Sequence, residues 1–384
     1  MDIEKIKKAL ADDEMPQELA QKLFADNGFL IIQNCPPGLE FGVDFKSWTI
    51  AEKFLGLKLI PPGIHYFFLS TTHAPRIGFF KCFKGNEIHL LKWDKKAESF
   101  EDKIASKEDI ERLKANLQNI DRNLAAYPFS TSQNWIQLSN FIGEKTIERL
   151  KPKNCHGLIT GQPETVTKEE ELAEEIKDKS KVFNVDRENP ERTRFRDSAG
   201  LPIMKVKPGF EIPFTKIPDV PFTEESKYRP GIDNSDRLDL LAKSLGNNYN
   251  EVLAEFQYAF VVFLIGQVYD GYDQWKRLIH LFSSCRAALV THEKFFLEYL
   301  MTLFFQIKQC PDDFFVDVLS KDNFLSTTLA WFFANVEDAP EILSPQLRQK
   351  TAKVKVFLKR NLIDLSIFHL INLFNNAGVI FHLI

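Results

Sequence analysis

The sequence predicts an α+β protein with a β-rich antiparallel N-terminal domain and flanking helices, followed by an all-α antiparallel helical domain. Two observations predict this class. Short apolar runs separated by proline and glycine turns continue to about residue 93, and apolar residues recur with a helical period from Ser235 onward. The predicted boundaries are a β-rich domain at 16–151, a proline-rich charged connector at 152–232, a helical domain at 233–360 and an apolar tail at 361–384.

Strands bounded by strong turn signals fill the first region. A short helix is predicted over Leu19 to Phe24, and Asn27-Gly28 ends it. The predicted strands are 29–32, 54–60, 64–69, 76–83 and 87–93. Pro61-Pro62-Gly63 marks a turn, and Lys84-Gly85-Asn86 predicts a hairpin between the last two strands. Because no helical crossover separates the strands, an antiparallel sheet is expected.

Residues 106–150 change to a helical pattern. Ser106 and Asp109 form a capping pair, and apolar residues follow at helical spacing until Tyr127-Pro128 breaks the pattern. A second helical stretch is marked by Trp135, Leu138, Ile142, Ile147 and Leu150. We expect both stretches to cover one face or end of the sheet.

The connector combines a dense charge run, KEEELAEEIKDKSK, with many prolines. The prolines are Pro163, Pro190, Pro202, Pro208, Pro213, Pro218, Pro221 and Pro230. Prolines at this density prevent regular helix and discourage interior strands. The segment is interpreted as a solvated linker, with a segment laid extended over another surface as the alternative.

The second half is helical. Ser235 is predicted to cap a helix over 236–245, and Asn250 to cap the long stripe that follows. A break is expected near Gly266 to Gly271, which makes a helical hairpin. Further helices are predicted over 294–307, 313–320 and 324–335. Short loops between them favour an antiparallel bundle. Trp48 and Trp275 are both interpreted as core residues.

The composition indicates a globular intracellular protein. Among 384 residues, 49 Lys and Arg face 53 Asp and Glu, which gives a net charge of −4. No basic stripe is apparent, so direct contact with nucleic acid is not expected. The cysteines are odd in number and widely spaced, which predicts a reduced protein; they are Cys35, Cys82, Cys155, Cys285 and Cys310. The acidic N-terminal residues predict no secretory signal.

No linear motif predicts catalysis, a cofactor or a metal. His65, His73, Cys82 and His89 match no zinc spacing. Nucleophile elbows, catalytic cysteine signatures and phosphate-binding loops do not occur. Asp270 and Asp273 share a helix face, as countless solvated carboxylates do. We therefore predict a protein that is not an enzyme, with no catalytic, cofactor-binding or metal-ligating residue.

Two segments have open roles. Ser198 follows the arginine-rich cluster DRENPERTRFRDS; phosphorylation there would add about −1.5 to −2 charge and fold or release the connector. The cluster is interpreted as a solvated loop, with an RNA-contacting arm as the alternative. The tail has the roughly 20-residue length of a membrane span, but its histidine and asparagine side chains are costly in hydrocarbon. Docking on protein is favoured over a membrane anchor or an error in the gene model.

Several blocks of this sequence resemble the Aar-two splicing-factor family. In the first half these are FGVDFKSW (Phe41 to Trp48), the stretch from Phe54 to His65 that ends in PPGIH, and RIGFF from Arg76. In the second half they are EFQYAFVVFLIGQVYDGYDQWK (Glu255 to Lys276) and DFFVDVLSKDNFL (Asp313 to Leu325). The resemblance extends, with interruptions, from about residue 19 to about residue 335.

The resemblance implies a non-enzymatic, chaperone-like role in mRNA splicing. Family members assist assembly of the U-five small nuclear ribonucleoprotein (snRNP) of the spliceosome. They bind its large scaffold protein, Prp-eight, at the RNase-H-like and Jab/MPN domains, and they keep the Brr-two helicase away until nuclear maturation. The resemblance therefore implies a cytoplasmic protein, with the nucleus as a second location, and a helical domain similar to VHS-type bundles.

Phosphorylation governs release of the scaffold in some family members. Ser198 and Ser344, which precedes Pro345, are the candidate sites in this sequence. The family's C-terminal tail takes part in scaffold binding, whereas the apolar tail of this chain departs from the charged or polar tails of the family. Two other functions stay open: an enzyme with an inter-domain site that lacks linear motifs, and a membrane-tethered adaptor that uses residues 361–384.

Overall fold

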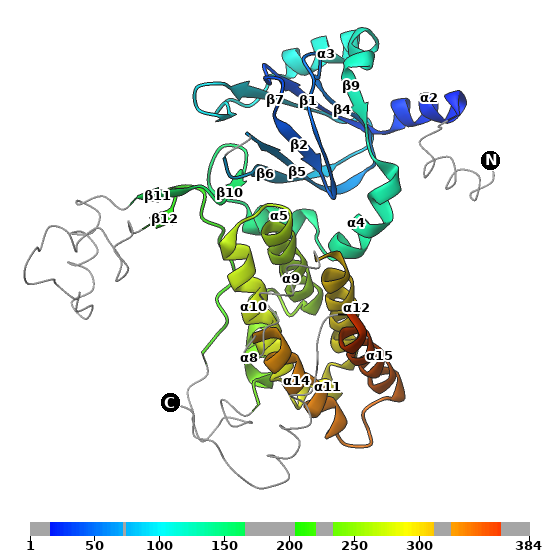
Figure 1. Cartoon of the computed structure of the whole chain (residues 1–384), viewed down its shortest axis with the longest axis vertical. Coiled ribbons are helices and arrows are strands. Elements are labelled where there is room, and N and C mark those ends of the chain that lie inside the picture. The colour runs from blue at the N-terminus through cyan, green and yellow to red at the C-terminus, as the bar shows by residue number, and fades with distance from the viewer. Residues whose placement is uncertain (1–15, 72–73, 166–203, 220–232, 311–323, 362–384) are drawn as a thin grey trace, which may run out of the picture. The chain divides into compact units, whose positions relative to one another are not determined.

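Figure 1 shows the computed structural model, which describes residues 16–71, 74–165, 204–219, 233–310 and 324–361. These residues form two compact units. A strand-rich unit holds the described residues of 17–127 and 150–213, and a helical unit holds those of 128–149 and of 214 onward. The predicted α+β class, with a β-rich first part and an all-α second part, is confirmed.

The strand-rich unit contains two five-stranded sheets and a short two-stranded one. The first has the order β8 (Ser99–Phe100), β7 (Ile88–Asp94), β1 (Gly28–Gln33), β4 (Gly56–Ile60), β9 (Leu124–Ala126). The second has the order β10 (Ile159–Thr160), β6 (Ile77–Phe83), β5 (Gly63–Ser70), β2 (Glu40–Val43), β3 (Lys46–Thr49). The third pairs β11 (Pro163–Thr165) with β12 (Met204–Val206). The second sheet is antiparallel throughout, whereas the first is mixed because β1–β7 and β4–β9 are parallel pairs.

The predicted hairpin between β6 and β7 does not form. β6 pairs with β5 and β10, while β7 pairs with β1 and β8, so the turn at 84–86 carries the chain from one sheet to the other. The Phe79 and Phe83 rings of β6 lie 5.8 and 6.4 Å from the His89 ring of β7, which places these strands on facing inner surfaces. Facing sheets bury the apolar side chains of both strands, which a solvent-facing hairpin would not.

Helix α3 (Lys107–Ile120) covers the first sheet. It begins with the predicted capping box: Asp109 N–H donates to Ser106 Oγ at 3.1 Å, and the Asp109 carboxylate accepts from Ser106 N–H. The apolar stripe of α3, including Leu117, packs with Phe29 and Ile31 of β1. α2 (Gln17–Asp26) lies against β4.

The helical unit contains the remaining described helices. They are α4 (Ser132–Ser139), α5 (Glu144–Leu150), α8 (Ser235–Ser244), α9 (Tyr249–Leu264), α10 (Tyr269–Ser283), α11 (Ala288–Thr291), α12 (Glu293–Gln309), α14 (Phe324–Glu337) and α15 (Pro345–Asn361). α9 is buried on every side from Glu251 to Val262 and forms the centre of the unit. α4 packs against α9 and α12, so it belongs to this unit and not to the expected cover of the sheet.

Two helix starts differ from the sequence prediction, while the predicted helix break is confirmed. Asn248, not Asn250, caps α9, because its side chain accepts from the Asn250 N–H at 3.0 Å. The Ser235 hydroxyl donates to Asp233 at 2.5 Å and accepts from the Ala288 N–H, so it does not cap α8. α9 ends at Leu264 and α10 begins at Tyr269.

Gly271 allows the first turn of α10 to approach α9 closely. A Cβ at this position would lie 2.6 Å from the Ala259 carbonyl oxygen and 2.9 Å from the Phe263 amide nitrogen. Both of these are backbone atoms, which cannot give way as a flexible side chain can. The glycine is therefore required by helix packing, in addition to marking the break.

The described residues of the predicted connector divide between the two units. Its described residues 152–165 and 204–213 belong to the strand-rich unit, and Phe214–Asp219 belongs to the helical unit. The rest of the connector, including Ser198, and the tail at 362–384 lie outside the described residues, as does the helix predicted over 313–320. No helix among the described residues is long and apolar enough to span a bilayer.

Candidate protein-binding groove

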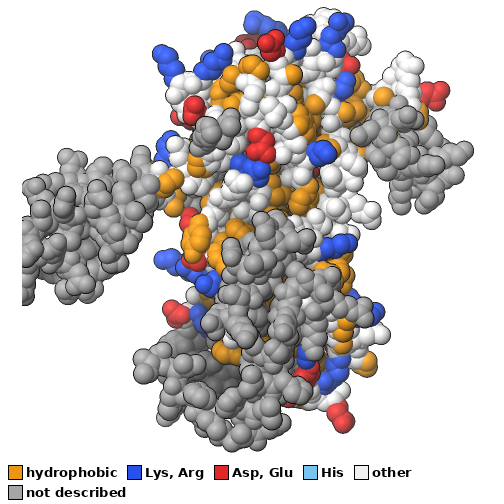
Figure 2. All heavy atoms as spheres, in the orientation of Figure 1, with side chains coloured by type: hydrophobic (Ala, Val, Ile, Leu, Met, Phe, Trp, Pro, Cys, Tyr) orange, Lys and Arg blue, Asp and Glu red, His pale blue; other side chains and the backbone are white. Residues whose placement is uncertain are grey.

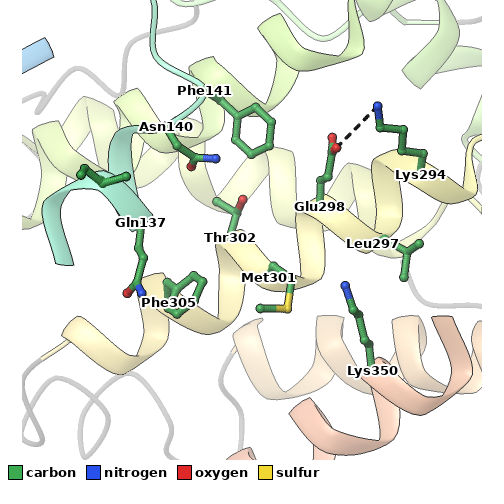
Figure 3. Close-up of a pocket in the computed structure, with 11 residues that line it drawn as sticks. Gln137, Asn140, Phe141, Lys294, Leu297, Glu298, Met301, Thr302, Phe305 and Lys350 are labelled. Carbon is green, nitrogen blue, oxygen red and sulfur yellow. Dashed lines mark ion pairs between the residues drawn. The ribbon is translucent and has the colours of Figure 1, made fainter. Parts of the chain in front are cut away.

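A groove of about 550 Å³ opens between three helices of the helical unit (Figure 3). Its lining comes from α4 and the two residues after it, from α12, and from α15. The lining residues are Ile136, Gln137, Asn140, Phe141, Lys294, Leu297, Glu298, Met301, Thr302, Phe305 and Lys350. Segments far apart in sequence therefore build one concave surface.

The spacing of apolar residues along α12 explains the floor of the groove. Leu297, Met301 and Phe305 follow one another at intervals of four, so they share one helical face, and each is partly exposed. Other faces carry Phe296 and Leu303, which are fully buried in the core of the unit. α12 thus has more apolar surface than its own unit covers.

Gln257 holds the α4 side of the groove in place. Its side chain, on α9, is fully buried; its Oε1 accepts from the Phe141 N–H at 2.8 Å and its Nε2 donates to Asn140 Oδ1 at 2.8 Å. A buried amide that satisfies both partners fixes the backbone where α4 ends. Phe141 and Ile136, which is 59% exposed, are thereby presented to the groove.

Charged side chains line the rim. Lys294 Nζ lies 3.9 Å from Glu298 Oε1, and the Lys294 side chain is 87% exposed. Lys350 extends from α15 on the opposite side (Figure 3). An exposed pair at this distance contributes little to stability, so both charges stay available to a partner. An apolar floor with a charged rim is the usual anatomy of a protein-binding surface.

The groove residues are suited to binding an apolar partner. The lining is mainly apolar and amide side chains, with Lys294, Glu298 and Lys350 as its charged groups. Aliphatic and aromatic side chains of a partner would displace water from Leu297, Met301 and Phe305. The groove therefore fits an apolar segment of another protein.

Two of the sequence blocks meet in a buried cluster of the strand-rich unit. Asp44, from FGVDFKSW, accepts from Tyr127 Oη at 2.7 Å and from His65 Nδ1 at 2.9 Å, and His65 belongs to PPGIH. His65 Nε2 contacts the Pro61 carbonyl oxygen at 2.9 Å. Burial and the Asp44 charge raise the pKa of Tyr127, which keeps its hydroxyl a donor. All three side chains are nearly inaccessible, so the cluster holds strands together and does not receive a substrate.

The other histidines and cysteines noted in the sequence have structural surroundings. Burial lowers the pKa of His89 to about 4, so its ring is neutral at pH 7 and packs between Phe79 and Phe83. Cys82 is half-buried on β6, and His73 lies outside the described residues. Among the residues that the structure describes, no three His, Cys, Asp or Glu side chains converge as metal ligands would.

The paired carboxylates lie on α10. Burial, and then the charge of Asp273, raise the pKa of Asp270, while Asp273 pairs with Arg277 at 3.0 Å. Ser344 precedes α15; its Oγ accepts from the Leu347 N–H at 3.2 Å and donates to Glu293 of α12. Ser344 is thus half-buried at a helix junction.

Sequence reasoning missed the polar residues that position the groove and its helices. Gln257 and Glu255 lie within the apolar stripe of α9, where a polar residue on a helix with no exposed face signals a buried hydrogen-bond network. Glu255 accepts from Arg149 Nη1 at 2.6 Å and from Thr215 Oγ1 at 2.6 Å. These partners are remote in sequence, so periodicity alone could not name them.

Comparison with known proteins matches both halves of the chain. Residues 26–152 match the family model of the AAR2 N-terminal domain, and residues 213–365 that of the AAR2 C-terminal repeat region. A Caenorhabditis elegans relative, "Protein AAR2 homolog", is 46% identical over 348 residues, which cover 90% of this chain and 96% of the relative. The human relative of the same name is 34% identical over 364 residues, which cover 91% of this chain and 93% of the relative. The mouse relative is 33% identical over 359 residues, covering 90% and 92%.

Proposed function

Because this chain belongs to the AAR2 (Aar-two) family, which is consistent with a splicing-related assembly factor, we propose that it binds the large scaffold protein of the U-five snRNP. It does so without enzymatic chemistry, during spliceosome particle biogenesis, and delays binding of the Brr-two helicase. The partner regions are the RNase-H-like and Jab/MPN domains of Prp-eight. The protein acts in the cytoplasm, with the nucleus as its second location.

The observation that carries this proposal is the groove of the helical unit. Its partly exposed Leu297, Met301 and Phe305 give an apolar segment of the scaffold a surface to bury, and the rim of Lys294, Glu298 and Lys350 supplies charges that set orientation. We assign this groove to a segment of the scaffold.

The distribution of charge supports a protein partner over RNA. On the face drawn in Figure 2, acidic and apolar side chains lie among the basic ones, and basic side chains are most frequent along the upper edge. The whole chain carries a net charge of −4. Phosphate backbones attract proteins through a net positive field, which a chain with this overall charge does not have.

A groove variant tests the proposal. Tagged full-length protein should recover Prp-eight, without Brr-two, from cytoplasmic extract. Replacing Met301 with aspartate places a charge on the apolar floor, and recovery is expected to fall at least about tenfold, since burying an unpaired charge costs several kcal/mol. Recovery is measured by quantitative mass spectrometry of the bound fraction.

The matched control is Ile104→Asp, because Ile104 is a 73% exposed apolar residue of the strand-rich unit. It should leave recovery unchanged, and both variants should keep the circular dichroism spectrum of the wild type. Full recovery by Met301→Asp would remove the groove from the interface. Failure of the wild-type chain to recover Prp-eight, while other U-five contacts survive, would reject the function itself.

Phosphorylation of Ser344 is expected to loosen α15. A phosphate there would bring about −1.5 to −2 charge against Glu293, to which the Ser344 hydroxyl donates. Because α15 supplies Lys350 to the groove, Ser344→Glu should lower recovery of the scaffold and the thermal midpoint. The double variant Ser344→Glu with Glu293→Gln removes the repulsion and should restore both. Equal losses in the single and double variants would exclude this switch. Ser198 stays a predicted phosphorylation site outside the described residues.

A further inference from the structure

A second pocket of the helical unit, of about 610 Å³, gathers positive charge. Its walls are the extended segment before Asp219, α8, α10 and α14. Its charged lining residues are Lys216, Arg237, Lys276, Arg277 and Asp219. It shares no lining residue with the groove described above.

The cations come from separate elements and are held by specific contacts. Arg237 Nε, on α8, donates to the Pro218 carbonyl oxygen at 2.8 Å, and its Nη2 lies 3.1 Å from Asp219 Oδ1. Arg277, on α10, pairs with Asp273 at 3.0 Å. Lys216 makes no ion pair among the described residues. These contacts hold the Arg237 side chain in position at the wall of the pocket.

The acidic side chains offset only part of this charge. Asp219 is 99% exposed at the side chain, so water screens its interaction with Arg237 strongly. Among the described residues, Lys216, Arg237 and Arg277 line one cavity together with Asp219, and Asp273 lies beside it. Clustered like charges repel one another, and an anion in the cavity would relieve that repulsion.

The positive charge of the pocket also acts on His280. Partial burial, and then the charge of Arg237, lower the pKa of His280, so its ring is neutral at pH 7. The described groups that face it are Arg237 of α8 and Trp331 of α14, whose ring centroid lies 6.1 Å away. A neutral imidazole can donate one N–H to an anion and gains a proton when a negative charge arrives.

We propose that this pocket binds a phosphorylated serine or threonine side chain within a peptide segment of a partner protein. A phosphate dianion has three acceptor oxygens and about twice the charge of a carboxylate, which matches several converging Lys and Arg donors. The inference goes beyond the proposed function, because it requires neither the groove nor the identity of the scaffold.

The uncharged lining favours a peptide over a nucleic acid. Ile217, which is half-buried, offers an aliphatic contact to the residues that flank a phosphorylated side chain. Among the lining residues, His280 is the one ring; the Trp331 ring, 6.1 Å from it, is not part of the lining. The cations also surround a cavity and do not form a line along which a nucleic-acid backbone could lie.

The test uses the full chain and three probes: a pool of short peptides with a central phosphoserine, the same pool without phosphate, and inorganic phosphate. Fluorescence anisotropy at low salt should give binding to the phosphorylated pool at least about tenfold tighter than to the other two, as one or two charge-assisted hydrogen bonds provide. In proton NMR, the pKa of His280 should rise when the phosphorylated pool is added.

Variants localise the site. Lys216→Gln with Arg277→Gln removes two cations without touching the Arg237 contacts, and should weaken binding of the phosphorylated pool about tenfold. Lys353→Gln, an exposed lysine of α15 outside the pocket, should leave it unchanged. Equal binding of both peptide pools, or undiminished binding by the double variant, would overturn the proposal. So would inorganic phosphate or a single-stranded RNA binding as tightly as the phosphorylated pool.

Discussion

Replacing Trp275 with alanine is expected to lower the free energy of unfolding by about 3–5 kcal/mol, the cost of deleting a fully buried aromatic side chain. Trp275 is inaccessible to solvent, and its ring centroid lies 5.5 Å from Phe260 and 6.4 Å from Phe256. Its Nε1–H also donates to the buried Gln306 Oε1 at 2.9 Å. Urea denaturation followed by circular dichroism measures the change.

Trp275→Phe separates the contribution of the buried ring from that of the hydrogen bond to Gln306. The phenyl ring keeps most of the buried area but loses the hydrogen bond to Gln306, so a smaller loss of about 1–3 kcal/mol is expected. An unchanged denaturation midpoint for Trp275→Ala would contradict the role of this residue in the α9–α10 core.

Trp48 provides the matched control and corrects the interpretation of both tryptophans as core. It lies on β3, at the edge of the second sheet, and is only half-buried, with its ring 5.3 Å from Phe41. Trp48→Ala should therefore cost about 1–2 kcal/mol, from lost area and one aromatic pair. The sequence block FGVDFKSW is explained better by Asp44 than by its tryptophan.

Replacing Glu255 with alanine is expected to cost about 3–5 kcal/mol, the usual effect of removing one partner from a buried ion pair. Glu255 is 2% exposed; its carboxylate accepts from Arg149, from the backbone and hydroxyl of Thr215, and from Gln274 Nε2 at 2.9 Å. Among the described residues, its loss leaves the Arg149 guanidinium with Glu251, at 3.7 Å, as its ion-pair partner. Thermal and urea unfolding both measure the loss.

A double-mutant cycle distinguishes this network from simple packing. Glu255→Met combined with Arg149→Met removes both charges, and should cost less than the sum of the two single replacements because no charge stays unpaired. Glu298→Ala, at a 30% exposed glutamate that lies 3.9 Å from Lys294, should cost less than about 1 kcal/mol. Additive single effects in the cycle would show that the pair is not coupled.

Some features could be read from local sequence because local chemistry decides them. The capping box of Ser106 and Asp109 needs only residues three apart, and the break between α9 and α10 follows from the glycines near it. The strands β1, β4, β5, β6 and β7 were placed within a few residues by their apolar runs and turns. The pairing of these strands could not be predicted in the same way, because β6 and β7 belong to different sheets.

The sequence by itself determined the α+β class and the family, because periodicity, turns and the matching sequence blocks are written in consecutive residues; it did not predict β2 and β3. Only the tertiary structure decided which surfaces those elements form. It brought Phe141, Met301 and Lys350 to one groove, Lys216 and Arg277 to one pocket, and α4 to the helical unit. The physical reason is that hydrophobic burial and hydrogen-bond satisfaction are settled between residues distant in the chain, where no local pattern records the partner.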